Sequence, residues 1–306
     1  MTQKEKLIII GAGPAGLSAA LYAARADLDP LVFTGMELGG QVAVTNTIEN
    51  YPGFPDGVGG SELGELFQKQ AEKFGARLEF DSVTEVKLGE QPFIVKTYGK
   101  KYSAEVLILA TGASSVHLNV PGETELVGRG VSYCATCDGW FFKGKEVVVV
   151  GGGDSALEEA LFLTRFATKV RIVHRRDEFR GGALLQKRVR ENEKIELVFD
   201  SVVEKILGEE KVEAVILKNV KSGTVSQLAT DGVFVFIGHS PNTALYKGQL
   251  EMNDKDFLVI DDKMQTSIPG VFAAGEIADM NYKQVITSAG MGAAAAIQAT
   301  RYLENK

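Results

Sequence analysis

A short apolar run, a glycine-rich turn and a helical pattern follow one another twice in this chain, and this repetition limits the possible folds most strongly. The first turn lies between residues 6–10 and 17–25 and reads Gly11, Ala12, Gly13, Pro14, Ala15 and Gly16. The second lies between residues 146–150 and 157–166 and reads Gly151, Gly152, Gly153, Asp154, Ser155 and Ala156. Two such turns, about 140 residues apart, predict an α/β fold with two Rossmann-like dinucleotide-binding domains.

Each position of such a turn has a physical role. The first glycine permits a tight turn, the second lets the backbone approach a pyrophosphate, and the third lets the helix pack closely on the strand. The helix N-terminus attracts the phosphates. Ala156 at the third position is a permitted variant. Apolar runs at residues 31–33 and 169–173 supply the next strand of each domain.

Basic residues follow the second domain's next strand, where an NAD site would carry an acidic residue. They are His174, Arg175, Arg176 and, slightly later, Arg180. Guanidinium groups make forked, charge-assisted hydrogen bonds to a phosphate, whereas a carboxylate would repel it. The second domain is therefore predicted to bind NADPH, through its 2′-phosphate, rather than NADH.

By elimination, the first domain is expected to hold FAD, but its motif is incomplete. Its second strand ends at Phe33 and is followed by Thr34, Gly35 and Met36, with no acidic residue for the ribose hydroxyls. The backbone of residues 34–36 can serve instead, and Glu37 is close enough in sequence to be considered.

The only two cysteines, Cys134 and Cys137, form a Cys-x-x-Cys pair. A structural zinc site needs about four ligands. The three histidines (His117, His174 and His239) are widely scattered, and no second cysteine pair exists. No metal is therefore expected, and the pair is predicted to be a redox-active dithiol with one thiolate of lowered pKa.

Asp138 directly follows the second cysteine, and two interpretations of it stay open. A carboxyl group at this position can shuttle a proton to a leaving thiolate. Alternatively, Asp138 caps a helix or stabilises a turn.

Charge and hydropathy exclude other classes of protein. The net charge of −7 and the pI near 5.2 argue against nucleic acid as a partner, because phosphate binding needs a basic face. Residues 7–24 carry no charge and could be taken for a signal peptide or a membrane span, but residues 11–14 would interrupt a helix in its middle. We expect a cytoplasmic protein without membrane association.

These motifs, together and in order, resemble those of low-molecular-weight bacterial-type thioredoxin reductase over essentially the full chain. Besides the two glycine turns and the motifs around Cys134 and His174, the matching segments are residues 39–41, 49–53, 110–112, 270–275 and 282–284. The resemblance implies FAD, NADPH, thioredoxin as the protein substrate and a homodimer. It also implies that FAD is held by the N-terminal segment together with a returning C-terminal segment.

The resemblance implies further roles for individual residues. Cys137 would be the thiol nearer the flavin, Cys134 would attack the thioredoxin disulfide, and Asp138 would be their acid–base partner. Residues 34–41 would contact the FAD adenosine and pyrophosphate, with Asn50 near the flavin ring. The expected FAD contacts outside the first glycine turn are Thr34, Gly35, Met36, Gly39, Gly40, Gln41, Asn50, Ala110, Thr111, Gly112, Gly275, Glu276, Lys283, Gln284 and Val285.

Two of these positions depart from the family pattern. The family usually has aspartate where this chain has Glu276, and arginine where it has Lys283. Relatives that accept electrons from ferredoxin lose the arginine cluster, which this chain keeps. Because the first strand starts at residue 6, no additional N-terminal thioredoxin-like domain is expected.

The position of the dithiol predicts the domain organisation. Cys137 lies 14 residues before Gly151, so the dithiol belongs to the NADPH-binding half. We expect an FAD domain at residues 1–114 and 243–306, with the NADPH domain inserted at residues 115–242. Because nicotinamide and dithiol share one domain and must both reach the flavin, we expect that domain to rotate about the two crossings.

Three functions remain open from sequence. The first is an NADPH-dependent thioredoxin-disulfide reductase, in which a hydride passes from NADPH to FAD and its electrons then reach the disulfide. The second has the same chemistry with a glutaredoxin-like protein or a small disulfide as acceptor. The third is a redox sensor whose disulfide reports a state without turnover.

Overall fold

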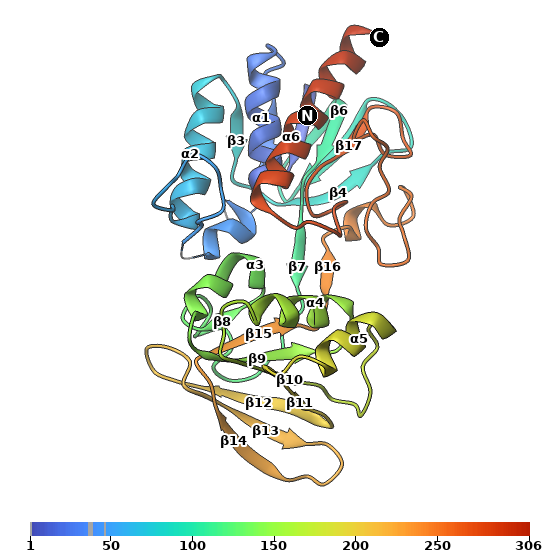
Figure 1. Cartoon of the computed structure of the whole chain (residues 1–306). Helices are drawn as coiled ribbons and strands as arrows, with labels where there is room; N and C mark the ends of the chain where they lie inside the picture. The colour runs from blue at the N-terminus through green and yellow to red at the C-terminus, as the bar shows by residue number, and fades with distance from the viewer. Residues whose placement is uncertain (1, 36–38, 46) are drawn as a thin grey trace. The chain divides into compact units, whose positions relative to one another are not determined.

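The computed structural model describes residues 2–35, 39–45 and 47–306, and its backbone forms two compact units. Unit 1 comprises Met1–Ser114 and Ser240–Lys306, and unit 2 comprises Ser115–His239 (Figure 1). Both units have the strand, glycine turn and helix that the motifs predict. The expected α/β fold is confirmed.

Unit 1 is built on a seven-stranded sheet in the order β3-β2-β1-β6-β5-β4, with β17 also paired to β6. Strands β1, β2, β3, β6 and β17 run parallel, whereas β4, β5 and β6 form an antiparallel meander. The bounds are β1 Thr2–Ile10, β2 Leu31–Phe33, β3 Arg77–Glu79, β4 Val83–Lys87, β5 Phe93–Thr97, β6 Lys101–Leu109 and β17 Val271–Ala273.

Strand β1 begins earlier than the apolar run predicts. Residues 2–5 have no apolar pattern, but they pair in register with β6, from Thr2 opposite Lys101 onward. Backbone pairing with a neighbouring strand therefore extends β1 beyond the segment that is buried on both faces.

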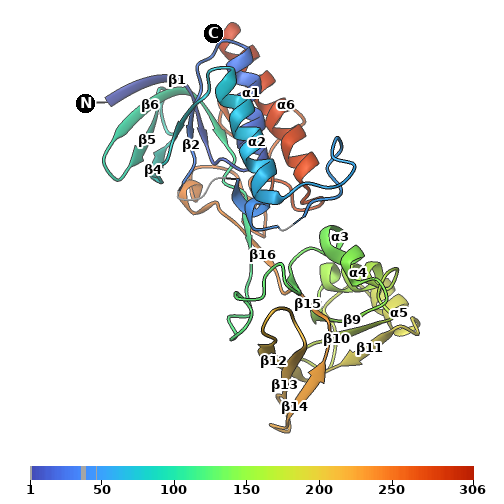
Figure 2. The same cartoon turned by 90° about the vertical axis from the view of Figure 1, so that its left-hand side faces the viewer.

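Helices α1 (Pro14–Arg25), α2 (Gly60–Lys73) and α6 (Val285–Glu304) lie beside this sheet (Figure 2). Helix α1 starts at Pro14, three residues before the predicted helical spacing, because proline is well suited to the first helical position. Helix α6 packs against α1 at a glycine: a Cβ on Gly292 would lie 2.0 Å from the Ala15 carbonyl oxygen. The short 3₁₀ helices η1 (Gly40–Val44) and η3 (Ala244–Tyr246) complete the unit.

Unit 2 contains a five-stranded parallel sheet in the order β11-β10-β9-β15-β8. Its strands are β8 Val131–Ser132, β9 Glu146–Gly151, β10 Lys169–Val173, β11 Ile195–Val198 and β15 Gly232–Phe236. Its helices are α3 Ala135–Asp138, η2 Gly139–Phe142, α4 Asp154–Leu163 and α5 Ala183–Arg190.

Helix α4 is shifted toward the N-terminus relative to the predicted pattern. It starts within the glycine turn at Asp154 and ends at Leu163, because the backbone of residues 164–167 turns back on the last helical carbonyls. Leu157, Ala160 and Leu163 point into the core of unit 2.

An antiparallel meander follows the parallel sheet of unit 2. Its strands are β12 Ser201–Leu207, β13 Ala214–Asn219 and β14 Val225–Ala229. Val203, Ile206 and Val215 pack with Val148 and Val150 of β9, so the meander covers the face of the sheet opposite α4.

The chain crosses between the units twice, through β7 (Ala113–Ser115) and β16 (His239–Pro241), which pair with one another. Asn242 ties the second crossing to the first. Its side chain donates to the Thr111 carbonyl (2.8 Å) and accepts from the Ser114 hydroxyl (3.2 Å), while its backbone N–H donates to Gly112 (2.9 Å). These bonds explain why residues 240–242 belong to unit 1.

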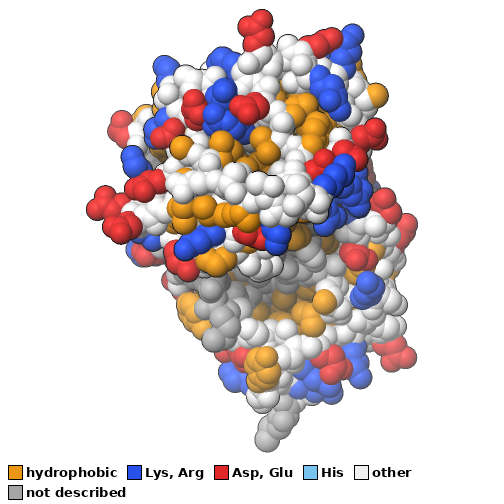
Figure 3. Space-filling view, turned by 90° about the horizontal axis from the view of Figure 1, so that it is seen from below, with side chains coloured by type: hydrophobic (Ala, Val, Ile, Leu, Met, Phe, Trp, Pro, Cys, Tyr) orange, Lys and Arg blue, Asp and Glu red, His pale blue; other side chains and the backbone are white. Residues whose placement is uncertain are grey.

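The surface carries acidic and basic side chains mixed together on the face drawn in Figure 3. Among the described helices, none is both long and apolar enough to cross a membrane. Residues 2–35, 39–45 and 47–306 also contain no group of three or more His, Cys, Asp or Glu side chains suited to a metal ion.

Candidate active site

The first glycine turn leaves room where a pyrophosphate would approach. Gly11 has φ +111°, and a Cβ there would lie 2.2 Å from the Ala110 carbonyl oxygen. A Cβ on Gly16 would lie 1.9 Å from the Gly11 carbonyl oxygen. By contrast, a Cβ on Gly13 would have its nearest neighbour 4.0 Å away. The middle glycine thus borders open space at the N-terminus of α1, as a phosphate cradle requires.

Segments far apart in sequence meet around this turn. The Gly39 N–H donates to the Ala12 carbonyl at 3.1 Å, and a Cβ on Gly40 would lie 3.4 Å from the Gly13 Cα. A Cβ on Gly275 would lie 2.8 Å from that of Ala15. The N-terminal and C-terminal parts of unit 1 therefore converge on one site, as the resemblance implies.

Several predicted FAD contacts have their polar groups engaged within the protein. The Thr34 hydroxyl donates to the Gly35 carbonyl at 2.9 Å, and the Thr111 hydroxyl donates to the Asn242 carbonyl at 2.8 Å. Ala110 is buried beside β1, whereas Gln41 is exposed. Met36 and the alternative Glu37 lie outside the described residues.

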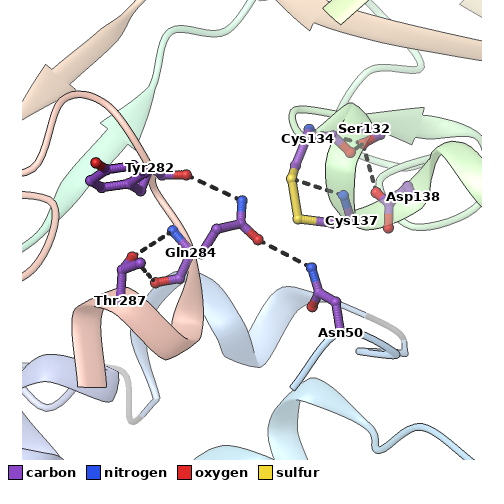
Figure 4. Close-up of a disulfide and its surroundings, with 8 residues drawn as sticks. All are labelled: Asn50, Ser132, Cys134, Cys137, Asp138, Tyr282, Gln284 and Thr287. Atoms are coloured by element: carbon purple, nitrogen blue, oxygen red, sulfur yellow. Dashed lines mark hydrogen bonds between the residues drawn. A yellow bond between two sulfur atoms is a disulfide. The ribbon is translucent and has the colours of Figure 1, made fainter. Parts of the chain in front are cut away.

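The start of α6 presents an ordered polar group. Gln284 caps the helix and shares a capping box with Thr287, and its side-chain oxygen accepts from the Asn50 amide at 3.1 Å (Figure 4). Its side-chain nitrogen donates to the Tyr282 carbonyl at 3.3 Å. Asn50 and Gln284, which are 234 residues apart in sequence, are thus neighbours in unit 1. Val285 is the first residue of α6.

Glu276 is a half-buried acid in the returning segment of unit 1. Burial raises the pKa of its carboxyl, the nearby Lys283 charge lowers it and Asp279 raises it. Asp279 accepts hydrogen bonds from the backbone N–H groups of residues 281–283, which fixes the loop that carries Lys283. The two residues that depart from the family pattern therefore interact with each other.

The second glycine turn repeats the open middle position. A Cβ on Gly151 would lie 2.5 Å from the Phe236 carbonyl oxygen, whereas one on Gly153 would have no neighbour within 4 Å. Ala156 is buried and Ser155 is exposed at the start of α4. Unit 2 therefore has room for a second pyrophosphate at a helix N-terminus.

The loop carrying Arg180 is attached to this turn by backbone bonds. The N–H groups of Arg180 and Gly181 donate to the Gly152 carbonyl at 2.8 and 3.1 Å. The Asp154 carboxylate accepts from the Gly182 N–H at 2.7 Å. Asp154, predicted as a cofactor contact, thus holds the arginine loop against the glycine turn.

The three arginines are exposed and surround a buried histidine. Burial lowers the pKa of His174, and the charges of Arg180, Arg176 and Arg175 lower it further. Among the described residues these arginines form no salt bridge, while the acidic Asp177 beside them pairs with Lys221 at 2.8 Å. The cluster is therefore a cationic surface suited to an anionic ligand.

His174 has a different position from the arginines. It is buried beneath the glycine turn, where a Cβ on Gly152 would lie 2.4 Å from its ring nitrogen Nδ1, and it also contacts Phe179. Its Nε2 is buried without a hydrogen-bond partner in the described structure.

Cys134 and Cys137 form a disulfide at the start of α3, with 5.3 Å between their Cα atoms (Figure 4). The Cys137 N–H donates to the Cys134 sulfur at 3.1 Å. This sulfur thus lies at the N-terminus of a helical turn, a place that favours a thiolate over a thiol.

Asp138 does not cap a helix in this structure. It precedes η2 without a side-chain capping bond, and its carboxylate instead accepts from the Ser132 hydroxyl at 2.6 Å. Burial raises the pKa of Asp138, and the bond from Ser132 lowers it. An acid whose pKa is raised by burial holds its proton more readily than an exposed aspartate and can deliver it to a thiolate, so the geometry favours the first of the two interpretations.

Two residues next to the dithiol, Ser132 and Tyr133, were not predicted from the sequence as part of the site. Ser132 is buried two residues before Cys134. Tyr133 donates to Glu123 at 2.9 Å and contacts His117 at 2.7 Å, while Glu123, only 1% exposed, accepts from backbone N–H groups at residues 118 and 119. A polar pair just before the motif is the sequence feature that could have indicated both.

Comparison with known proteins agrees with this geometry. The model of the pyridine nucleotide-disulphide oxidoreductase family matches residues 5–292. The chain belongs to this family. The family's name specifies a pyridine nucleotide and a disulfide; in this chain the glycine turn and arginines of unit 2 suit the first, and the Cys134–Cys137 bond is the second.

Individual relatives show which members of this family the chain is similar to. The chain is 46% identical to a thioredoxin reductase of Coxiella burnetii, over 99% of this chain and 98% of the relative. It is 48% identical to a bifunctional thioredoxin reductase/thioredoxin of Mycobacterium leprae, over 97% of this chain and 66% of the relative. The solved thioredoxin reductase of Streptococcus pyogenes has a TM-score of 0.95 and 42% identity, with 100% of both chains covered. The resemblance inferred from the motifs is confirmed.

Proposed function

We propose that this chain is an NADPH-dependent thioredoxin-disulfide reductase, with FAD bound in unit 1 and NADPH in unit 2. The assignment rests chiefly on unit 2, which combines an arginine-flanked dinucleotide turn with a disulfide beside an acid whose pKa is raised by burial. When bound, NADPH supplies a hydride and FAD passes its electrons to the disulfide.

The domains follow the same assignment. We assign the FAD domain to residues 1–114 and 243–306 and the NADPH domain that carries the dithiol to residues 115–242; the compact units divide three residues earlier at the second crossing, between His239 and Ser240. The open middle glycine and the converging C-terminal segment support FAD in unit 1. The unpaired arginines among the described residues support NADPH in unit 2.

The two cysteines have different roles in the reduced protein. The Cys137 N–H stabilises a thiolate at Cys134, so Cys134 attacks the acceptor disulfide and forms a mixed disulfide. Cys137 then displaces the acceptor, re-forming the Cys134–Cys137 bond. Asp138 gives its proton to one leaving thiolate of the acceptor, and the proton released by the Cys137 thiol goes to the other, so the acceptor leaves as a dithiol.

An exposed aromatic pair beside the dithiol supports a protein as the acceptor. Trp140 is 52% exposed and Phe141 is 41% exposed, although both are large apolar side chains. Lys143 lies over the Trp140 ring at 4.9 Å. Exposed aromatic residues of this kind commonly anchor protein partners.

Assembly and location belong to the same proposal. Tyr22 of α1 and Ile286 and Ile297 of α6 expose apolar surface on two adjacent helices of unit 1, which supports a homodimer. Light scattering with detection of mass tests this. A dithiol that cycles between oxidised and reduced states suits the reducing cytoplasm.

Unit 2 is proposed to change its orientation during turnover, because the nicotinamide and the dithiol cannot use the flavin at the same time. Within residues 2–35, 39–45 and 47–306, the chain passes from one unit to the other at β7 and β16, which pair with each other. A reversible chemical crosslink between units should stop turnover and leave flavin bound. Full turnover by the crosslinked protein would exclude the rotation.

Stopped-flow mixing of the purified protein with NADPH and oxidised thioredoxin tests the function. We expect a yellow protein whose flavin is bleached rapidly and is reoxidised rapidly by thioredoxin. Replacing both cysteines by serine should abolish reoxidation by thioredoxin but leave bleaching by NADPH. A colourless protein, or a double variant that still reduces thioredoxin, contradicts the proposal.

A panel of acceptors separates the competing functions. Faster reoxidation by a glutaredoxin-like protein or a small disulfide would assign another acceptor to the same chemistry. Slow bleaching without reoxidation by any acceptor would indicate a redox sensor.

A further inference from the structure

The Ser132 hydroxyl, next to the dithiol, has three hydrogen-bond partners: the Asp138 carboxylate, the Cys134 carbonyl and the Cys134 N–H. The hydroxyl lies 2.6 Å from the Asp138 carboxylate and 3.2 Å from the Cys134 carbonyl oxygen, and it accepts from the Cys134 N–H at 3.1 Å (Figure 4). The side chain is 4% exposed, so water does not replace these partners readily. One hydroxyl therefore connects the acid to the backbone of the attacking cysteine.

A serine hydroxyl has one proton to donate and two lone pairs that accept. When Asp138 is ionised, the hydroxyl donates to the carboxylate and accepts from the Cys134 N–H. When Asp138 is protonated, the carboxyl donates to the hydroxyl, which turns its own proton to the Cys134 carbonyl. The second arrangement uses the whole capacity of the hydroxyl, and neither arrangement leaves it without a partner.

We propose that Ser132 is a positioning residue that keeps the Asp138 carboxyl hydrogen-bonded in both of its protonation states. This inference rests on the proposed function, in which Asp138 releases and regains one proton in each cycle. A buried acid without such a partner would strongly favour its neutral form and would regain its proton more easily than it released it.

The surroundings leave Ser132 as the main polar influence on Asp138. Burial raises the pKa of the carboxyl and the Ser132 bond lowers it; within the described residues, no charged side chain of η2 or α4 contributes. After reduction of the disulfide, the thiols of Cys134 and Cys137 are the other titratable groups next to it in sequence. Removal of the hydroxyl should therefore move proton release to higher pH.

The test measures the Asp138 carboxyl directly. Flavin-loaded protein is reduced with dithiothreitol, and the carbonyl band of the protonated Asp138 carboxyl is followed against pH by infrared difference spectroscopy for wild type, Ser132→Ala and Ser132→Thr. We expect the profile of Ser132→Ala to move upward by about one pH unit, the scale of one hydrogen bond to a charged group. Ser132→Thr keeps the hydroxyl and should restore the wild-type profile.

A double variant shows whether the effect passes through Asp138. In an Asp138→Asn background the band should be absent with and without Ser132→Ala, because the titrating carboxyl is gone. Superimposable profiles for wild type and Ser132→Ala would overturn the proposal. So would the same band, moved in the same way by Ser132→Ala, in the Asp138→Asn background.

A second pair of variants tests the proposal if Ser132→Ala does not fold. Ser132→Thr and Ser132→Val have the same shape and differ in the hydroxyl, and both residues suit a strand. If Ser132→Ala loses its flavin, a displaced profile for Val but not for Thr supports the proposal, and equal profiles overturn it. Because the infrared titration needs no thioredoxin, a failure of the proposed acceptor would appear only in the stopped-flow assay.

Discussion

Helix α1 of unit 1 begins with Pro14 after its glycine turn, whereas helix α4 of unit 2 begins with Asp154. Proline fixes the backbone angle of the first helical residue and brings no side-chain hydrogen bond. Aspartate places a charge at the positive end of the helix and binds the Gly182 N–H at 2.7 Å. The start of α1 is thus stabilised by the fixed backbone angle of Pro14, and the start of α4 by the hydrogen bond between the Asp154 carboxylate and the loop at Gly182.

The third position of the two turns differs for a related reason. In unit 1, α1 is confined on two sides: by the Gly11 carbonyl next to Gly16, and by α6, where Gly292 meets Ala15. In unit 2, Ala156 has room for its methyl group because Gly151 has no side chain: a Cβ on Gly151 would lie 2.6 Å from the Ala156 Cβ. The same motif therefore tolerates alanine at its third position in one unit and excludes it in the other.

The largest expected effect comes from Gly16→Ala. Its new Cβ would overlap the Gly11 carbonyl oxygen at 1.9 Å, and α6 prevents α1 from moving away. We expect loss of bound flavin, measured by absorbance, and a loss of stability of about 3 kcal/mol or more. The matched change Ala156→Gly should cost only about 1 kcal/mol, the ordinary penalty of a helical glycine. Equal losses would show that the two turns are not packed differently.

The next effect concerns the arginines, which have no counterpart in unit 1. Arg175→Ala with Arg176→Ala should raise the KM for NADPH roughly a hundredfold, since each charge-assisted bond contributes about 1.5–3 kcal/mol. The KM for NADH should change little, because NADH lacks the 2′-phosphate. Arg165→Ala, at another exposed arginine of unit 2, is the control. A similar rise for both nucleotides would refute the 2′-phosphate assignment.

A smaller effect should follow loss of the hydrogen bond between the Asp154 carboxylate and the Gly182 N–H. Asp154→Ala removes the acceptor for the Gly182 N–H and loosens the loop that carries Arg180. We expect the KM for NADPH to rise by about tenfold or less, as for loss of a single hydrogen bond. Asp154→Asn keeps an acceptor oxygen and should restore most of the affinity. Pro14→Ala in unit 1 should leave flavin content unchanged, and a loss of flavin there would contradict the comparison.

Sequence predicted the elements whose pattern is local. The runs at residues 31–33 and 169–173 form β2 and β10 with these bounds. The two glycine turns connect strand to helix as expected. Elements set by distant partners were not predicted: β1 is extended by β6, and the meander of unit 2 has no motif that indicates it.

The site divides in the same way. The disulfide and the two glycine turns are formed by consecutive residues, so sequence alone located them; the arginine cluster as a 2′-phosphate site stays a prediction. The role of Ser132 depends on a hydroxyl that reaches Asp138 six residues later, and that of Asn242 depends on a partner 131 residues away. Burial also separated His174 from the adjacent arginines, which no local pattern could indicate.

The smallest expected effect compares one half-buried acid from each unit, Glu276 in unit 1 and Asp138 in unit 2. Burial raises the pKa of both carboxyl groups, so ionisation destabilises the folded state. The penalty is absent below the unfolded pKa, about 4 for such groups, and grows as pH rises toward the folded pKa. Glu276→Gln and Asp138→Asn should therefore raise the Tm of the flavin-loaded protein at neutral pH by a few degrees at most, and should match wild type in acid. Thermal unfolding measured from acid to neutral pH checks this, and a gain that is larger in acid would show that burial does not control these two carboxyl groups.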